Sequence, residues 1–210
     1  MKTLSHLILI LFIATLISCD LLEPDTDVVK GEQSPIGKVG EKAYVRNIPG
    51  VNNFTATVTS LENGISTYKS QVTVNNTAVL NILKNIPEFT VVGNTASTQG
   101  LKFKITTEGI ESLNSSYPGV LVNYNSKVGD TYKGASGYKR EVISKSTDDD
   151  YPFGSLLIKV LEIEESPCSV PGVKKLTYYA NHKFGIVGAV LVFDDNSQLT
   201  IGFDYSTTNK

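Results

Sequence analysis

The chain has 210 residues, with 19 basic and 21 acidic side chains and a formal net charge of −2. This balance leaves no basic surface of the kind that binds nucleic acid or anionic lipid. Hydrophobic residues make up 40% of the chain, including 10 Tyr and 8 Phe, which argues against disorder over most of its length. The composition predicts a globular domain without nucleic acid as a partner.

The first 18 residues have the layout of a signal peptide. Lys2 supplies a short basic region, and Leu7–Ile17 form an uncharged apolar run. A bilayer-spanning helix needs about 20 apolar residues, and this run is well short of that. We therefore expect residues 1–18 to be removed from the mature protein.

The apolar run ends in Leu16-Ile17-Ser18-Cys19. These four residues resemble the lipobox of bacterial lipoproteins. The resemblance implies that the Cys19 sulfur receives a diacylglycerol, that the chain is cut before it, and that the new amine is acylated, typically with palmitate. Two or three acyl chains hold a protein stably at a membrane. A plain secretory signal with a coincidental cysteine is the alternative.

Lipidation at Cys19 would place the protein in the envelope of a Gram-negative bacterium, anchored to a membrane by its acyl chains. We expect the outer membrane, and Asp20 leaves open whether the protein faces the periplasm or the cell surface. Residues 19–38 are acidic, contain Pro24 and Pro35, and predict a flexible tether. Residues 39–210 are expected to form one β-rich domain.

Most of this domain alternates between apolar and polar residues, as strands do. One example is a hairpin from Phe54 to Val74, with Asn63-Gly64 as a type I′ turn. Another is the block from Leu176 to Tyr205, which predicts three consecutive strands. The expected fold is mostly β, either all-β or α+β, with a strongly curved antiparallel sheet or half-barrel.

One segment has helical rather than strand periodicity. Val79, Ile82, Leu83 and Ile86 recur at i, i+3, i+4 and i+7, which predicts a short amphipathic helix. Asn76 or Thr77 can cap its first turn, and Pro87 ends it. We expect this helix to cover one face of the sheet.

Few residues suggest catalysis. Cys168 and His182 are the only thiol and imidazole left after Cys19 is acylated and the signal peptide is removed, and neither lies in a known nucleophile motif. A zinc site would need more ligands of these kinds. Asp148-Asp149-Asp150 lack the spacing of a calcium loop and predict an exposed turn. We therefore expect no enzyme activity, no metal and no cofactor.

The segments VGDTYK (Val128–Lys133) and LTYYANHKFGIVGAVLVF (Leu176–Phe193) resemble parts of the lipoprotein localisation domains related to LolA and LolB. The resemblance covers about residues 120–205. It implies a curved antiparallel sheet closed on its concave side by helices, which in some members binds acyl chains. This chain departs from that pattern in lacking Trp and in having one convincing helix.

The strand that contains Ile186 is apolar on both faces, so a second layer must cover it. The helix at Val79–Ile86 is the expected cover, which predicts a pocket for an apolar or amphipathic ligand such as an acyl chain. Candidate ligand-binding residues are Val79, Ile82, Leu83, Ile86, Tyr178 and Ile186. An ordinary filled core is the alternative for this region.

A different class of function is a cell-surface module that recognises a glycan or a protein. Seven tyrosines could supply aromatic platforms for sugars; they are Tyr117, Tyr124, Tyr132, Tyr138, Tyr151, Tyr178 and Tyr179. Tyrosine is also a common half-buried strand residue, so the sequence leaves this choice open. The sequence also leaves the oligomeric state open.

Overall fold

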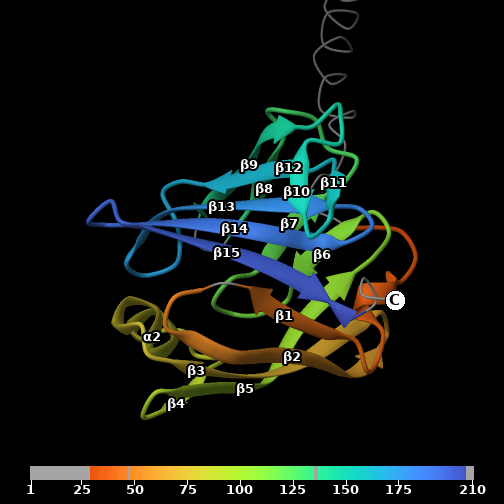
Figure 1. The fold of residues 1–210 in the computed structure, drawn as a ribbon. Helices are drawn as coiled ribbons and strands as arrows, with labels where there is room; N and C mark the ends of the chain where they lie inside the picture. Colours follow the sequence, from red (N-terminus) through yellow and green to blue (C-terminus); the bar gives the residue numbers. More distant parts are fainter. Residues whose placement is uncertain (1–28, 47, 135–136, 207–210) are drawn as a thin grey trace, which may run out of the picture.

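The computed structural model describes residues 29–46, 48–134 and 137–206 (Figure 1). The predicted signal peptide, the lipobox and the first ten residues of the predicted tether lie outside the described residues. Within these ranges the fold is mostly β, with α2 (Thr77–Lys84) as the one α-helix and η1 (Pro35–Gly37) as a 3₁₀ turn.

The strands of the main sheet are β1 (Lys42–Arg46), β2 (Val51–Glu62), β3 (Ile65–Val74), β4 (Thr90–Val92), β5 (Thr95–Ile105), β6 (Gly109–Ser112), β7 (Gly119–Asn123), β8 (Thr131–Lys133), β9 (Lys139–Lys145), β12 (Leu161–Glu165), β13 (Val173–Asn181), β14 (Gly185–Phe193) and β15 (Gln198–Tyr205). A separate two-stranded sheet consists of β10 (Tyr151–Phe153) and β11 (Leu156–Ile158).

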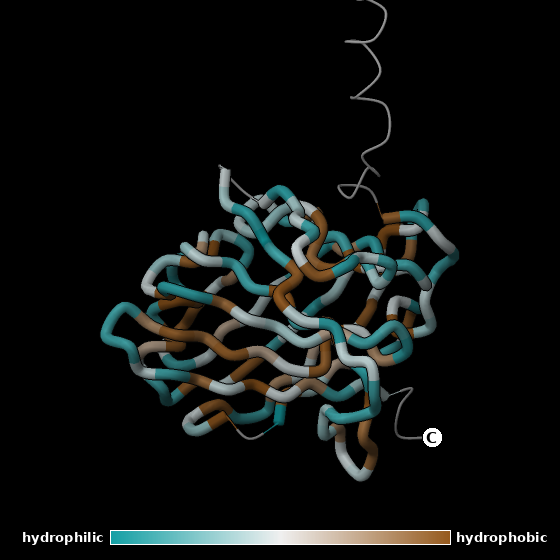
Figure 2. Tube along the Cα trace, turned by 90° about the horizontal axis from the view of Figure 1, so that it is seen from above, coloured by the Kyte–Doolittle hydropathy of each residue, from teal (hydrophilic) through white to brown (hydrophobic). Residues whose placement is uncertain are grey.

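Every pairing in the main sheet is antiparallel, in the order β7-β6-β5-β3-β2-β1-β15-β14-β13-β12-β9-β8, with β4 beside β5. The sheet curls until its edge strands β7 and β8 approach each other, which gives a nearly closed barrel (Figure 1). The predicted curved antiparallel sheet is confirmed. Hydrophobic residues follow the strands, and hydrophilic residues gather at the turns (Figure 2).

Local sequence signals account for the β2–β3 hairpin and for α2. Asn63 and Gly64 have φ of 52° and 77°, as a type I′ turn requires. The Asn76 side chain accepts a hydrogen bond from the Val79 N–H at 3.2 Å, so Asn76 is the N-cap of α2. Both predictions are confirmed.

Side chains of β8 and β9 contact the opposite edge of the sheet across the seam of the barrel. Arg140 on β9 donates from Nη1 to the carbonyl oxygens of Pro118 and Val120, at 2.9 and 3.0 Å. The Asn123 N–H donates to the Tyr132 hydroxyl at 3.3 Å. These contacts give hydrogen-bond partners to polar backbone atoms of β7 and of Pro118, the residue before it, at a sheet edge.

The end of the predicted tether differs from the expectation. Val29 and Ile36 are only 1% and 2% exposed and belong to the main hydrophobic core, and Gln33 forms a β-bridge with Thr106. Residues 29–38 are therefore part of the globular domain. Apolar residues isolated among Gly, Pro and acidic residues carry no strand or helix period, which is why the pattern predicted a tether.

The cover of the Ile186 strand also differs from the expectation. The outer face of β14 packs against the β10–β11 hairpin, where Phe153 and Ile158 form a cluster with Phe184 and Val187. The helix α2 packs instead against Val72 on β3 and its neighbours. A hairpin thus supplies the second layer that the apolar strand requires.

Candidate functional site: an apolar cavity inside the barrel

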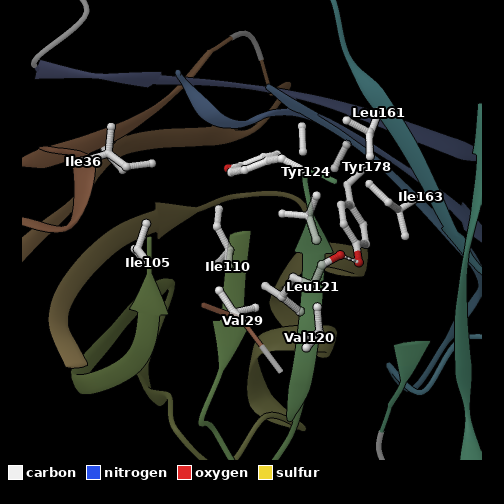
Figure 3. Close-up of a cluster of buried hydrophobic side chains, with 14 of the residues drawn as sticks. Val29, Ile36, Ile105, Ile110, Val120, Leu121, Tyr124, Leu161, Ile163 and Tyr178 are labelled. Atoms are coloured by element: carbon white, nitrogen blue, oxygen red, sulfur yellow. Dashed lines mark hydrogen bonds between the residues drawn. The ribbon is translucent and has the colours of Figure 1, made fainter. Parts of the chain in front are cut away.

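A cavity of about 170 Å³, partly open to the surface, lies within the barrel between the β1–β7 half of the sheet and β14–β15. Every residue that lines it has an aliphatic or aromatic side chain. The lining residues are Ile36, Ala43, Phe54, Ala56, Tyr68, Leu101, Phe103, Ile105, Ile110, Leu121, Ile186, Phe203 and Tyr205. Ile36, Ile105, Ile110 and Leu121 are labelled in the view of the surrounding core (Figure 3).

Strand alternation places these side chains on the concave face, and two small residues leave space between them. Ala43 on β1 lies directly opposite Ala56 on β2 in the strand register. Larger neighbours such as Phe54 and Phe203 are only partly buried and form the walls. An Ala–Ala pair facing bulky side chains therefore explains the cavity at this point of the core.

The two tyrosines in the lining present their rings rather than their hydroxyls. The Tyr68 hydroxyl donates to the Ile36 carbonyl oxygen at 2.8 Å, and the Tyr205 hydroxyl donates to the Ile186 carbonyl oxygen at 3.2 Å. Burial raises the pKa of both phenols well above the ordinary value, so both stay neutral. The cavity surface is apolar, with its polar groups already paired.

The volume limits what the cavity can hold. Pockets for drug-sized ligands usually measure about 300–1,000 Å³, whereas an engineered apolar cavity of about 150 Å³ binds benzene. A cavity of about 170 Å³ suits one aromatic ring or a short alkyl segment. It does not suit a complete diacyl lipid.

Of the six predicted ligand-binding residues, Ile186 lines the cavity. Val79 and Leu83 pack into a neighbouring cluster around Val72 and Ala96, to which Phe54 of the cavity wall also belongs. Helix α2 therefore borders the cavity through Phe54 and does not line it.

The other three residues lie elsewhere. Ile82 borders a groove between α2 and the β14–β15 turn, and Ile86 is half-buried after the end of the helix. Tyr178 is buried in the core, and its hydroxyl donates to the Leu121 carbonyl oxygen on β7 (Figure 3). The pattern located the helix correctly, but it could not show which part of the sheet the helix packs on.

The chain was compared with known proteins. It matches no family model, no curated protein and no solved structure. Among the described residues, no helix is both long enough and apolar enough to cross a membrane.

The fold does not bring Cys168 and His182 together. Cys168 precedes β13 and His182 follows it, and a nine-residue strand spans roughly 30 Å. Cys168 is only 8% exposed, and burial raises the pKa of its thiol to about 12. A thiol with this pKa is almost entirely protonated at neutral pH, so it is a poor nucleophile.

The acidic run is an exposed turn before β10. Asp148, Asp149 and Asp150 are all exposed, and the Ser146 hydroxyl donates to Asp150 Oδ1 at 2.8 Å. Across the described ranges, no three His, Cys, Asp or Glu side chains come close enough together to hold a metal ion.

Most of the predicted tyrosine platform faces inward. Tyr124, Tyr132 and Tyr178 are at most 9% exposed, and Tyr117 lies under the Arg140 guanidinium at 4.0 Å from the ring centroid. The remaining three are half-buried, and two of them, Tyr151 and Tyr179, stack on each other with centroids 4.9 Å apart. A sugar-binding platform would need several exposed aromatic faces on one surface.

Proposed function

We propose that this protein is a noncatalytic lipoprotein of the bacterial envelope whose β-rich domain binds the apolar part of a small ligand. The cavity inside the barrel carries this proposal, because it combines an apolar lining with paired polar groups. Natural cores are close-packed, so an unfilled apolar space of this size can bind a ligand through the hydrophobic effect. No cofactor or metal enters the proposal.

Membrane attachment through the acylated Cys19 is the second part of the proposal. Its support is the order of a basic residue, an eleven-residue apolar run and the sequence Leu16-Ile17-Ser18-Cys19. The likeness of residues 120–205 to LolA-type domains remains a prediction, and the proposal does not depend on it. Recognition of a glycan or a protein is the alternative function.

Ligand binding can be tested by filling the cavity. Ala56→Leu adds three carbons to its lining, so we expect affinity for octanol and toluene to fall at least about tenfold, as measured by ligand-observed NMR. Thr57→Leu is the matched control, since Thr57 is the next residue of β2 and does not line the cavity. Ala43→Leu repeats the test from β1.

Two outcomes would contradict ligand binding in this cavity. Wild-type protein that takes up neither probe, and that carries no apolar molecule in native mass spectrometry, would rule out this use of the cavity. Equal affinities for wild type and both cavity-filling variants, with folding verified by circular dichroism, would place the ligand elsewhere.

The anchor is tested on the full chain expressed in a Gram-negative host. We expect labelled palmitate to be incorporated and the protein to fractionate with membranes, and Cys19→Ser to abolish both. Cys168→Ser is the control, because its buried thiol plays no part in the predicted attachment. Incorporation of label into the Cys19→Ser chain would refute lipidation at this cysteine.

A further inference from the structure

A second, polar hollow lies close to the apolar cavity and contributes to no function proposed so far. This cleft of about 380 Å³ is at the end of the barrel where the β13–β14 turn and the residues after β9 meet. Its walls include Lys145, Lys159 and His182, and its apolar floor includes Tyr124, Leu161 and Ala180.

The cleft carries two positive charges, and the ammonium group of Lys145 is held in a defined position. Lys145 Nζ donates to the carbonyl oxygens of Tyr124 and Ser126, at 3.1 and 2.9 Å. The Lys159 carbonyl oxygen accepts a hydrogen bond from the buried Asn181 side chain at 2.6 Å, which fixes the backbone that presents Lys159. Both ammonium groups belong to exposed residues and can therefore donate hydrogen bonds to an anion.

Acidic side chains do not line this cleft among the described residues. The exposed acidic turn Asp148–Asp150 follows the lining residue Ser146, whose hydroxyl donates to Asp150 Oδ1 at 2.8 Å. Because the two lysines line the cleft and these carboxylates lie outside its lining, the cleft favours an anionic group over a cation.

The floor of the cleft and the wall of the cavity belong to one hydrophobic cluster. Tyr124 and Leu161 of the cleft pack in the same buried core as Ile110 and Leu121 of the cavity. Figure 3 shows the Tyr124 ring between Ile110 and Leu161. Tyr124 lines the polar hollow, and its ring lies in the core that both hollows share; Ala180 of the cleft also pairs with Ile186 of the cavity across β13 and β14.

We infer that the ligand is an anionic amphipath. Its alkyl chain occupies the apolar cavity, its carboxylate or phosphate head lies between Lys145 and Lys159, and the Tyr124 ring turns aside to join the two hollows. This inference rests on the proposed function, and it adds the charge of the ligand and its direction of entry. The short cavity favours a single medium-length chain over a diacyl lipid.

The test compares three probes of equal chain length on the intact protein: octanoate, octanol and octylammonium, by isothermal titration calorimetry. We expect octanoate to bind at least about fivefold tighter than octanol, with octylammonium the weakest, since hydrogen bonds to charged groups contribute more than neutral ones. Octyl phosphate, run in parallel, distinguishes a phosphate head from a carboxylate.

Charge variants then locate the head group. Lys159→Gln should remove most of the preference for octanoate and leave octanol affinity unchanged. Lys183→Gln is the matched control, because it removes the same charge from a nearby exposed residue that does not line the cleft. Tyr124→Ala should raise affinity for dodecanoate relative to octanoate by opening the path between the hollows.

The results separate the two proposals. Failure of every probe to bind overturns the proposed function together with this inference. Binding of all three probes with equal affinity, or equal effects of Lys159→Gln and Lys183→Gln, leaves the apolar site standing and overturns the anionic head. An unchanged chain-length preference in Tyr124→Ala overturns the route past this ring.

Discussion

At the scale of single residues, a buried ion pair lies at the barrel seam. The side chains of Arg140 and Glu165 are fully buried, and Arg140 Nε lies 2.9 Å from Glu165 Oε2. Glu165 also accepts hydrogen bonds from the N–H and hydroxyl of Ser169, at 2.7 and 2.6 Å. Because Arg140 also donates to the carbonyl oxygens of Pro118 and of Val120 on β7, this pair connects β9 and β12 to the opposite edge of the sheet.

Removing one partner of this pair should be far more damaging than removing both. Arg140→Met leaves the Glu165 charge buried without its cation, and we expect a loss of about 3–5 kcal/mol in unfolding free energy. The double variant Arg140→Met with Glu165→Leu should recover much of that loss. Urea unfolding followed by circular dichroism measures both, and additive single-variant effects would contradict the role of the pair.

At the scale of elements, the β10–β11 hairpin depends on a glycine beneath it. Gly188 on β14 pairs with Gly202 on β15, and a Cβ added to Gly188 would lie 2.3 Å from the Tyr151 hydroxyl oxygen. The Phe153 ring stacks on Phe184 with centroids 5.0 Å apart. Because Gly188 has no side chain, it leaves the space into which the hairpin packs.

The two paired glycines offer a matched comparison. Gly188→Ala should displace Tyr151 from its stack on Tyr179 and cost about 1–3 kcal/mol. Gly202→Ala should be tolerated, because its nearest new contact is an Arg46 side-chain atom at 3.6 Å. Thermal unfolding and limited proteolysis of the hairpin check this prediction. Equal stability of the two variants would contradict it.

At the scale of the whole molecule, features that depend on neighbouring residues in the sequence could be predicted. Features that depend on contacts between distant strands could not. The turn at Asn63-Gly64 and the cap at Asn76 depend on neighbouring residues and were predicted correctly. Nothing local shows that Arg140 points inward, because a charged residue in an alternating strand normally indicates the solvent face. The cavity depends on Ala43 lying opposite Ala56, a register between strands that periodicity alone does not determine.

The boundary of the domain gives the last prediction. Val29 and Ile36 are buried in the core. The Lys30 carbonyl oxygen accepts a hydrogen bond from the Thr106 hydroxyl at 2.5 Å, and the Thr107 N–H donates to the Glu32 carbonyl oxygen at 2.8 Å.

A chain of residues 39–210 loses all of these contacts, whereas a chain of residues 29–210 keeps them. Burial of two aliphatic side chains alone stabilises by about 3–6 kcal/mol, so we expect the shorter chain to unfold at much lower urea concentration. Ile36 also lines the cavity, and its loss should weaken octanol binding in the same chain. Indistinguishable urea midpoints for the two chains would mean that residues 29–38 act only as a tether.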